Sequence, residues 1–123
     1  MIPSDYAGRK WRSVTLAAKP GTKMDVVLTR VLGVMKALKS KCVVYACIEK
    51  THLHILYRGF YLHQRSWSEI FKICSNGSYI TWVKEIKSEQ HFSNLIGYMR
   101  EQAEIEKFIN WDKGIRLEEF MCL

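Results

Sequence analysis

Four short stretches of the chain have the apolar and β-branched pattern of β-strands. Residues 11–18 alternate apolar and polar side chains and are followed by a Pro-Gly turn signal. Residues 42–49 and 52–58 are two further strands, which a tight turn near Lys50 joins into a hairpin. Residues 79–86 are rich in β-branched and aromatic residues, which favour a pleated, half-buried surface. The chain is therefore predicted to contain at least four strands.

Three other stretches have apolar residues at the three-four spacing of an amphipathic helix. The first covers residues 24–38 and carries an acidic residue near its start. The second begins at Ser66 in a Ser-x-x-Glu capping-box pattern and stops at an Asn-Gly pair. The third begins at Ser88 or Ser93 and is expected to run to about Trp111.

The predicted order is strand–helix–strand–strand–helix–strand–helix. This is the split β-α-β order of ferredoxin-like α+β proteins, in which helices pack on one face of an antiparallel sheet of four or five strands. A length of 123 residues fits one domain spanning 1–123. Many unrelated functions use this architecture, so the order alone does not indicate one.

Composition narrows the choice of partner and compartment. Nineteen Lys and Arg against twelve Asp and Glu give a net charge of +7, which favours a polyanion such as nucleic acid. No apolar run approaches the ~20 residues that span a bilayer, and residues 1–6 lack a signal-peptide core. We therefore expect a cytoplasmic protein without membrane contact.

The four cysteines indicate neither a zinc knuckle nor a disulfide framework. None belongs to a C-x-x-C pair, so we expect reduced and mostly buried thiols, with a disulfide as the alternative if the source is a hyperthermophile. Cys42 and Cys47 are an odd number of residues apart on one strand and should face opposite sides of the sheet.

His52-Leu53-His54 is the most informative pattern in the chain. Side chains alternate faces along a strand, so His52 and His54 should point the same way and Leu53 the opposite way. Two imidazoles side by side on a rigid strand form half of a metal site. Further ligands must then converge on the same sheet face.

The third predicted helix carries polar residues that are candidates for the further groups of this site. Leu95, Tyr98, Gln102, Ile105 and Ile109 recur at helical spacing, and this stripe is apolar except at its middle. If the helix crosses the histidine-bearing strand, Gln102 offers a carbonyl oxygen to the metal and Tyr98 points at whatever the metal binds. Each residue alone has an ordinary structural interpretation, as a surface pair, a packed tyrosine or a helix former. Their combination with basic charge and this element order favours function.

These motifs resemble those of the HUH endonucleases, named for histidine–hydrophobic–histidine. The segment 52–56 (HLHIL) matches their histidine motif, and 95–102 (LIGYMREQ) matches their single-tyrosine motif. Residues 11–16 (WRSVTL) correspond to their first-strand motif. The Tyr-x-x-x-Gln spacing is most similar to that of the single-strand transposases, whereas Thr51 departs from the aspartate that often precedes their first histidine.

The resemblance implies a particular chemistry. Mg²⁺ or Mn²⁺ bound by His52, His54 and Gln102 would polarise a phosphate of single-stranded DNA. Tyr98 would attack the phosphorus, leaving a 5′-phosphotyrosine and a free 3′-OH that can later rejoin the strand. Glu49, three residues before His52, is a further candidate ligand or partner of a ligand.

The resemblance also implies a biological setting, and charge suggests the DNA contacts. Rolling-circle-like replication of a virus or plasmid is the leading expectation, and transposition of an insertion sequence is the alternative. A homodimer is expected. The candidate phosphate contacts are Arg12, Arg58, Arg65 and Arg100.

Two functions of other classes remain as alternatives. The same element order builds RNA-recognition sheets, in which exposed Tyr45, Tyr57 and Tyr79 would stack on bases. That module would bind without Tyr98 and without metal. A metal oxygenase of the cupin type also uses His-x-His, but cupins are all-β and the predicted helices argue against it.

Overall fold

The computed structural model describes residues 11–38, 42–59, 62–75 and 79–111. Its elements in chain order are β1 (Arg12–Ala18), α1 (Met24–Leu38), β2 (Val43–Glu49), β3 (His52–Arg58), α2 (Gln64–Ser75), β4 (Tyr79–Glu85), α3 (Glu89–Gln102) and β5 (Ile105–Asn110). The first six elements agree with the sequence prediction to within two residues at each described end.

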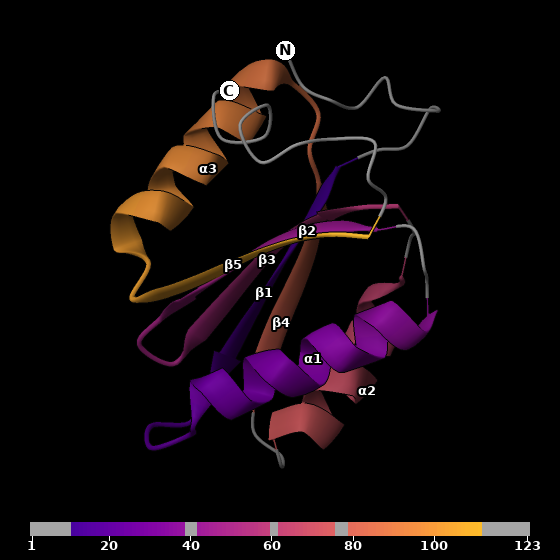
Figure 1. The fold of residues 1–123 in the computed structure, drawn as a ribbon, viewed down its shortest axis with the longest axis vertical. Helices are drawn as coiled ribbons and strands as arrows, with labels where there is room; N and C mark the ends of the chain where they lie inside the picture. Colours follow the sequence, from indigo (N-terminus) through magenta and orange to yellow (C-terminus); the bar gives the residue numbers. More distant parts are fainter. Residues whose placement is uncertain (1–10, 39–41, 60–61, 76–78, 112–123) are drawn as a thin grey trace.

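The five strands form one antiparallel sheet in the order β4-β1-β3-β2-β5. The strands β4-β1-β3-β2 have the split β-α-β arrangement, and β5 extends the sheet beside β2. The predicted ferredoxin-like α+β class is therefore confirmed, with five strands (Figure 1). The histidine-bearing strand β3 lies at the centre, so its backbone is hydrogen-bonded on both sides.

Helices α1 and α2 cover one face of the sheet, which we call the α1/α2 face (Figure 1). The apolar stripe of α1 is buried there, as its spacing predicts. It packs on the side chains of β1, β2 and β3 that point to this face, including Leu16, Val44 and Leu53. Trp67 and Phe71 of α2 join the same core.

Helix α3 packs on the opposite face, which we call the α3 face (Figure 1). Our expectation that the helices share one face is therefore wrong. Phe92, Ile96 and Met99 are the buried residues of α3, and the ring of Phe92 meets that of Trp11 edge-on with centroids 5.0 Å apart. Side chains alternate between the two faces of the sheet, and apolar residues occur on both faces. Both faces are therefore buried against helices.

The prediction of a helix continuing to about Trp111 is also wrong. Helix α3 ends at Gln102, Ala103 is extended, and residues 105–110 form β5. Ile105 and Ile109 are four residues apart, a spacing that fits a helix turn and equally one face of a strand. The edge of β2 decides between them, because pairing there satisfies its backbone groups.

Two smaller predictions concern helix starts. Helix α2 begins at Gln64, so the Ser66 capping box is wrong; the backbone N–H of Ser66 donates to the carbonyl of His63, and Nδ1 of His63 accepts from Arg65. Helix α3 is capped by Ser88, whose hydroxyl accepts from the N–H of His91 at 3.0 Å. Ser88 is therefore the cap, and Ser93 lies inside the helix.

The cysteines behave as predicted where the structure describes them. Cys42, Cys47 and Cys74 are buried thiols outside any disulfide, and Cys42 and Cys47 belong to the cores on opposite faces. Cys122 and the C-terminal segment 116–123 lie outside the described residues. Among the helices described, none is long and apolar enough to cross a membrane.

Candidate active site

His52 and His54 lie side by side on the α3 face of β3. Their ring centroids are 6.2 Å apart, and the ring planes are 22° from parallel. His52 is exposed, whereas His54 is half-buried between β1 and β2. The predicted common orientation of the two imidazoles is confirmed, and Leu53 is buried on the α1/α2 face.

Glu49 joins the histidines from the far side of the hairpin turn. It pairs with His52 in the β2–β3 register, and its Oε1 lies 3.3 Å from Nε2 of His54. Lys50 makes this approach possible, because its positive φ of 53° reverses the chain directly after Glu49. Sequence spacing left open whether Glu49 falls across the turn, and the hairpin register brings it to the histidines.

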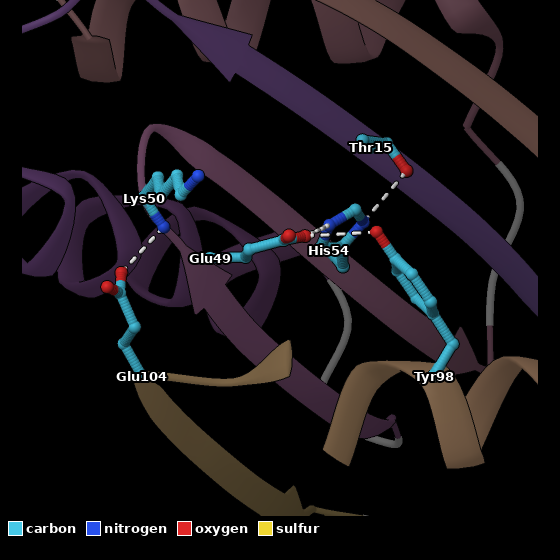
Figure 2. A network of polar contacts seen from close by, with 6 residues as sticks. All are labelled: Thr15, Glu49, Lys50, His54, Tyr98 and Glu104. Atoms are coloured by element: carbon cyan, nitrogen blue, oxygen red, sulfur yellow. Dashed lines mark hydrogen bonds and ion pairs between the residues drawn. The ribbon is translucent and has the colours of Figure 1, made fainter. Parts of the chain in front are cut away.

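Tyr98 completes the cluster from above the sheet. Its hydroxyl donates to Oε1 of Glu49 at 3.0 Å, and its ring meets that of His54 edge-on at a centroid distance of 5.8 Å (Figure 2). The side chain is 46% exposed, so a ligand can reach the phenol. Burial of Met99 and Ile96 fixes the helix, and Tyr98 beside this stripe extends toward the hairpin.

The surroundings of the cluster set its protonation. Hydrogen bonding to the Glu49 carboxylate, with smaller effects of burial and charge, raises the pKa of Tyr98 above the usual value. Burial lowers the pKa of His54 and outweighs the opposing effect of Glu49. The site at neutral pH therefore presents a protonated phenol and a neutral imidazole, the form of histidine that binds metals.

The lowered pKa of His54 predicts a loss of stability in mild acid. Below about pH 6.5 the unfolded chain takes up a proton at this histidine more readily than the folded protein does. The free energy of unfolding should therefore fall as the pH drops from 7 to 5. Urea unfolding of metal-free protein across this range, beside His54→Gln, measures the effect. The variant should show the weaker pH dependence, and identical slopes would contradict the prediction.

Thr15 is a residue that the sequence did not single out. It stands opposite His54 in the β1–β3 register, and its Oγ1 lies 3.4 Å from Nδ1 of His54. His54 therefore has a polar neighbour at each ring nitrogen, Thr15 at Nδ1 and Glu49 at Nε2 (Figure 2). Thr15 lies within the segment 11–16 that matches the first-strand motif, but only the strand register shows that it is a neighbour of His54.

Gln102 lies at the edge of the site. It is the last residue of α3 and is exposed. The chain directly after it is tied to the hairpin, since the N–H of Glu104 donates to Ile48 and the Glu104 carboxylate accepts from the N–H of Lys50 at 2.6 Å. Gln102 is thus held at the same end of the sheet as Glu49, while Glu49 is the residue that contacts Tyr98 and His54.

The donor set suits a divalent ion in composition. Glu49 supplies the carboxylate oxygen that Mg²⁺ and Mn²⁺ prefer, and Nε2 of His54 faces that oxygen, with His52 beside it. Within the described ranges, no three His, Cys, Asp or Glu side chains already stand in a metal-binding arrangement. His52 is exposed beside these two donors. Burial raises the pKa of the neighbouring Cys47 to about 12, so this thiol stays protonated and is a poor ligand.

Gln102 and His54 are predicted to differ in their contributions to metal binding. Gln102→Ala removes a neutral amide on an exposed side chain, so we expect Mn²⁺ affinity to fall by roughly 10-fold or less. His54→Ala removes an oriented imidazole and should weaken binding more strongly. Isothermal titration of both variants with Mn²⁺ compares them. Unchanged affinity in Gln102→Ala would remove this residue from the ligand set.

The predicted arginine contacts do not share one surface. Arg58 is fully buried, with its guanidinium 5.7 Å from the ring centroid of Trp11, so its assignment as a surface phosphate contact is wrong. Arg65 is exposed on α2, and Arg12 points to the same α1/α2 face. Arg100 is exposed on α3, two residues beyond Tyr98. Of the four arginines, Arg100 is the one exposed on the element that carries Tyr98.

Two of the three tyrosines expected to form an RNA-stacking platform are buried, and the side chain of the third, Tyr79, lies outside the described part of the structure. Tyr45 is buried beneath α3, and its hydroxyl donates to the Glu106 carboxylate at 2.5 Å. Tyr57 is buried on the α1/α2 face, and its hydroxyl accepts from the indole N–H of Trp67. Two of the three tyrosines of that alternative therefore cannot stack on bases.

Comparisons with known proteins identify a similar fold. No family model matches the chain, and no curated protein does. A solved structure that is similar is the hypothetical protein ORF119 from Sulfolobus islandicus rod-shaped virus 1, with a TM-score of 0.53 and 11% sequence identity. The match covers 79% of this chain and 85% of the viral protein. At this identity the likeness concerns the fold alone.

Proposed function

We propose that this protein is a metal-dependent endonuclease that nicks and rejoins single-stranded DNA through a 5′-phosphotyrosine on Tyr98. The observation that carries the proposal is the convergence of Tyr98, Glu49 and His54 from three separate elements. The accessible phenol of Tyr98 is hydrogen-bonded to the Glu49 carboxylate and lies beside the neutral imidazole of His54. These are the groups needed for tyrosine transesterification. The resemblance of the two motifs to HUH endonucleases supports the same chemistry.

The reaction is a transfer of a phosphoryl group to Tyr98 and back. The phenol oxygen forms a bond to the phosphorus, and the bond to the 3′-oxygen of the preceding nucleotide breaks. Oε1 of Glu49 already accepts the phenol hydrogen bond and is the group best placed to receive that proton, which ends on the departing 3′-oxygen. His52, His54 and Glu49, with Gln102 as the further ligand expected from the sequence, would hold a divalent ion, which would supply positive charge at the phosphate. Reversal of these steps rejoins the strand.

The proposed substrate follows from charge and accessibility. A net charge of +7 favours binding of the phosphate backbone, and Arg100 is exposed on α3, the helix that carries Tyr98. Tyr98 stands on an open surface, which an unpaired strand can approach closely. We propose that the protein acts in the cytoplasm. We also propose that it is a homodimer, and sedimentation of the purified protein tests this oligomeric state.

We propose nicking at an origin, as in rolling-circle-like replication, as the use of this chemistry. Transposition of an insertion sequence requires the same steps, so the two uses differ in their DNA. Oligonucleotides that carry replication-origin stem–loops or insertion-sequence end hairpins separate them.

The test is a nicking assay on labelled single-stranded oligonucleotides that include both hairpin classes. With Mn²⁺ present, we expect a slow-migrating protein–DNA adduct that survives SDS, together with a shorter labelled product. EDTA should abolish both species. Retarded DNA without an adduct, equally strong in EDTA, would contradict the proposal and favour a binding module.

A further inference from the structure

Strand β1 places a polar side chain opposite His54 and an apolar side chain opposite His52, the two candidate metal-binding histidines. In the β1–β3 register, Thr15 faces His54 and Ala17 faces His52. The two pairs are separated by one intervening pair, so they have the same backbone geometry in the antiparallel ladder. His54 therefore has a hydroxyl neighbour across the strands, whereas His52 has a methyl group.

The contact partners determine which nitrogen of His54 carries the proton. A carboxylate only accepts hydrogen bonds, so the 3.3 Å contact of Nε2 with Glu49 requires a proton on Nε2. Nδ1 is then an acceptor, and the Thr15 hydroxyl at 3.4 Å donates to it. This is the arrangement of the metal-free protein.

Metal binding through Nε2 requires the opposite tautomer. The lone pair of Nε2 must then be free, so the single ring proton resides on Nδ1. The ring loses a proton from Nε2 and gains one on Nδ1 through solvent, with no net change. A hydroxyl both donates and accepts, so Thr15 can serve either tautomer by rotating its O–H bond. A carbonyl or carboxylate in place of the Thr15 hydroxyl would only accept a hydrogen bond, so it would stabilise only the tautomer with the proton on Nδ1.

We propose that Thr15 is a positioning residue that holds the His54 ring in place in both tautomers and thereby orients Nε2 toward Glu49. The metal-bound half of this statement rests on the proposed function, and the metal-free half does not. Thr15 is suited to the task because its β-branched side chain has restricted rotamers and it lies on a strand paired on both sides.

The experiment is two-bond ¹H–¹⁵N NMR of histidine-labelled protein at pH 8, with and without Mg²⁺. In the wild type, we expect His54 to be the Nε2–H tautomer without metal and the Nδ1–H tautomer with Mg²⁺. Thr15→Val should shift the Nδ1 resonance of the metal-free protein and lower Mg²⁺ affinity by roughly 10-fold. Thr15→Ser should restore both values.

A matched control separates this role from general stability. Ser13→Ala removes a hydroxyl from the same face of β1, but opposite Leu56, and should leave His54 unchanged. Ala17→Thr places a hydroxyl opposite His52 and should move the Nδ1 resonance of His52 instead. Unfolding curves establish that each variant is folded before its spectrum is interpreted.

The outcomes distinguish the two proposals. Identical His54 resonances in wild type and Thr15→Val without metal would overturn the positioning role, whatever the enzyme does with DNA. A wild-type His54 unaffected by Mg²⁺ would overturn the metal-bound half together with the proposed metal site. A shifted Nδ1 in Thr15→Val, with no SDS-stable adduct formed by the wild type, would retain the role of Thr15 and overturn the proposed function.

Discussion

Replacement of Tyr98 by phenylalanine is expected to abolish the covalent protein–DNA adduct. The variant lacks the attacking oxygen, so nicking should fall by roughly 1,000-fold or more. Because the side chain is 46% exposed and forms its hydrogen bond at the surface, the fold should tolerate the change. Gel electrophoresis in SDS measures the adduct, and fluorescence anisotropy measures retention of DNA binding.

Tyr57→Phe is the matched control for that variant. It removes a phenol hydroxyl that accepts from Trp67 in the opposite core. We expect adduct formation at the wild-type level and a stability loss of about 1 kcal/mol. An adduct that persists in Tyr98→Phe and maps to another residue would contradict Tyr98 as the nucleophile.

Replacement of Glu49 by glutamine should nearly eliminate metal-dependent nicking. The change keeps the shape of the side chain but removes the negative charge beside His54 and the acceptor for the Tyr98 proton. We expect the nicking rate to fall by roughly 100- to 1,000-fold and Mn²⁺ binding to weaken. The pKa of Tyr98 should also drop toward its usual value, because the carboxylate that raises it is gone.

Glu104→Gln tests whether nicking requires Glu49 specifically or only an acidic residue near this turn. The Glu104 carboxylate lies at the same hairpin but accepts from the N–H of Lys50, and Figure 2 shows it pointing away from Tyr98. Its loss should leave nicking within a few-fold of the wild type. Equal losses in Glu49→Gln and Glu104→Gln would indicate that charge at the turn matters in general, and would remove Glu49 from its specific role.

The Tyr98→Phe and Glu49→Gln variants together separate the enzyme from a binding module. A module that only binds DNA would retain its affinity in both, with no adduct in the wild type. An endonuclease of the proposed kind loses the adduct in both while keeping most of its DNA affinity, because neither residue supplies positive charge. Burial of Tyr45 and Tyr57 already removes two of the three residues of an aromatic stacking platform.

The sequence by itself determined the elements whose patterns have one interpretation. The apolar stripe of α1, the β2–β3 hairpin and the common face of His52 and His54 follow from periods of 3.6 and 2, which are local properties of the chain. Tyr98 is identified through its motif and lies beside His54 as expected, although the buried residues of α3 are Phe92, Ile96 and Met99 and not the stripe that contains Tyr98.

Tertiary structure alone decided the rest. Residues 105–110 form a strand because they pair with the edge of β2, whereas the spacing of their apolar residues fits both a helix and a strand. The position of Glu49 depended on the turn at Lys50, and the partnership of Thr15 with His54 depended on the β1–β3 register. These contacts join residues 39 and 49 positions apart, Thr15 with His54 and Glu49 with Tyr98. Such contacts form only when non-local strands and helices pack, so no local pattern in the sequence encodes them.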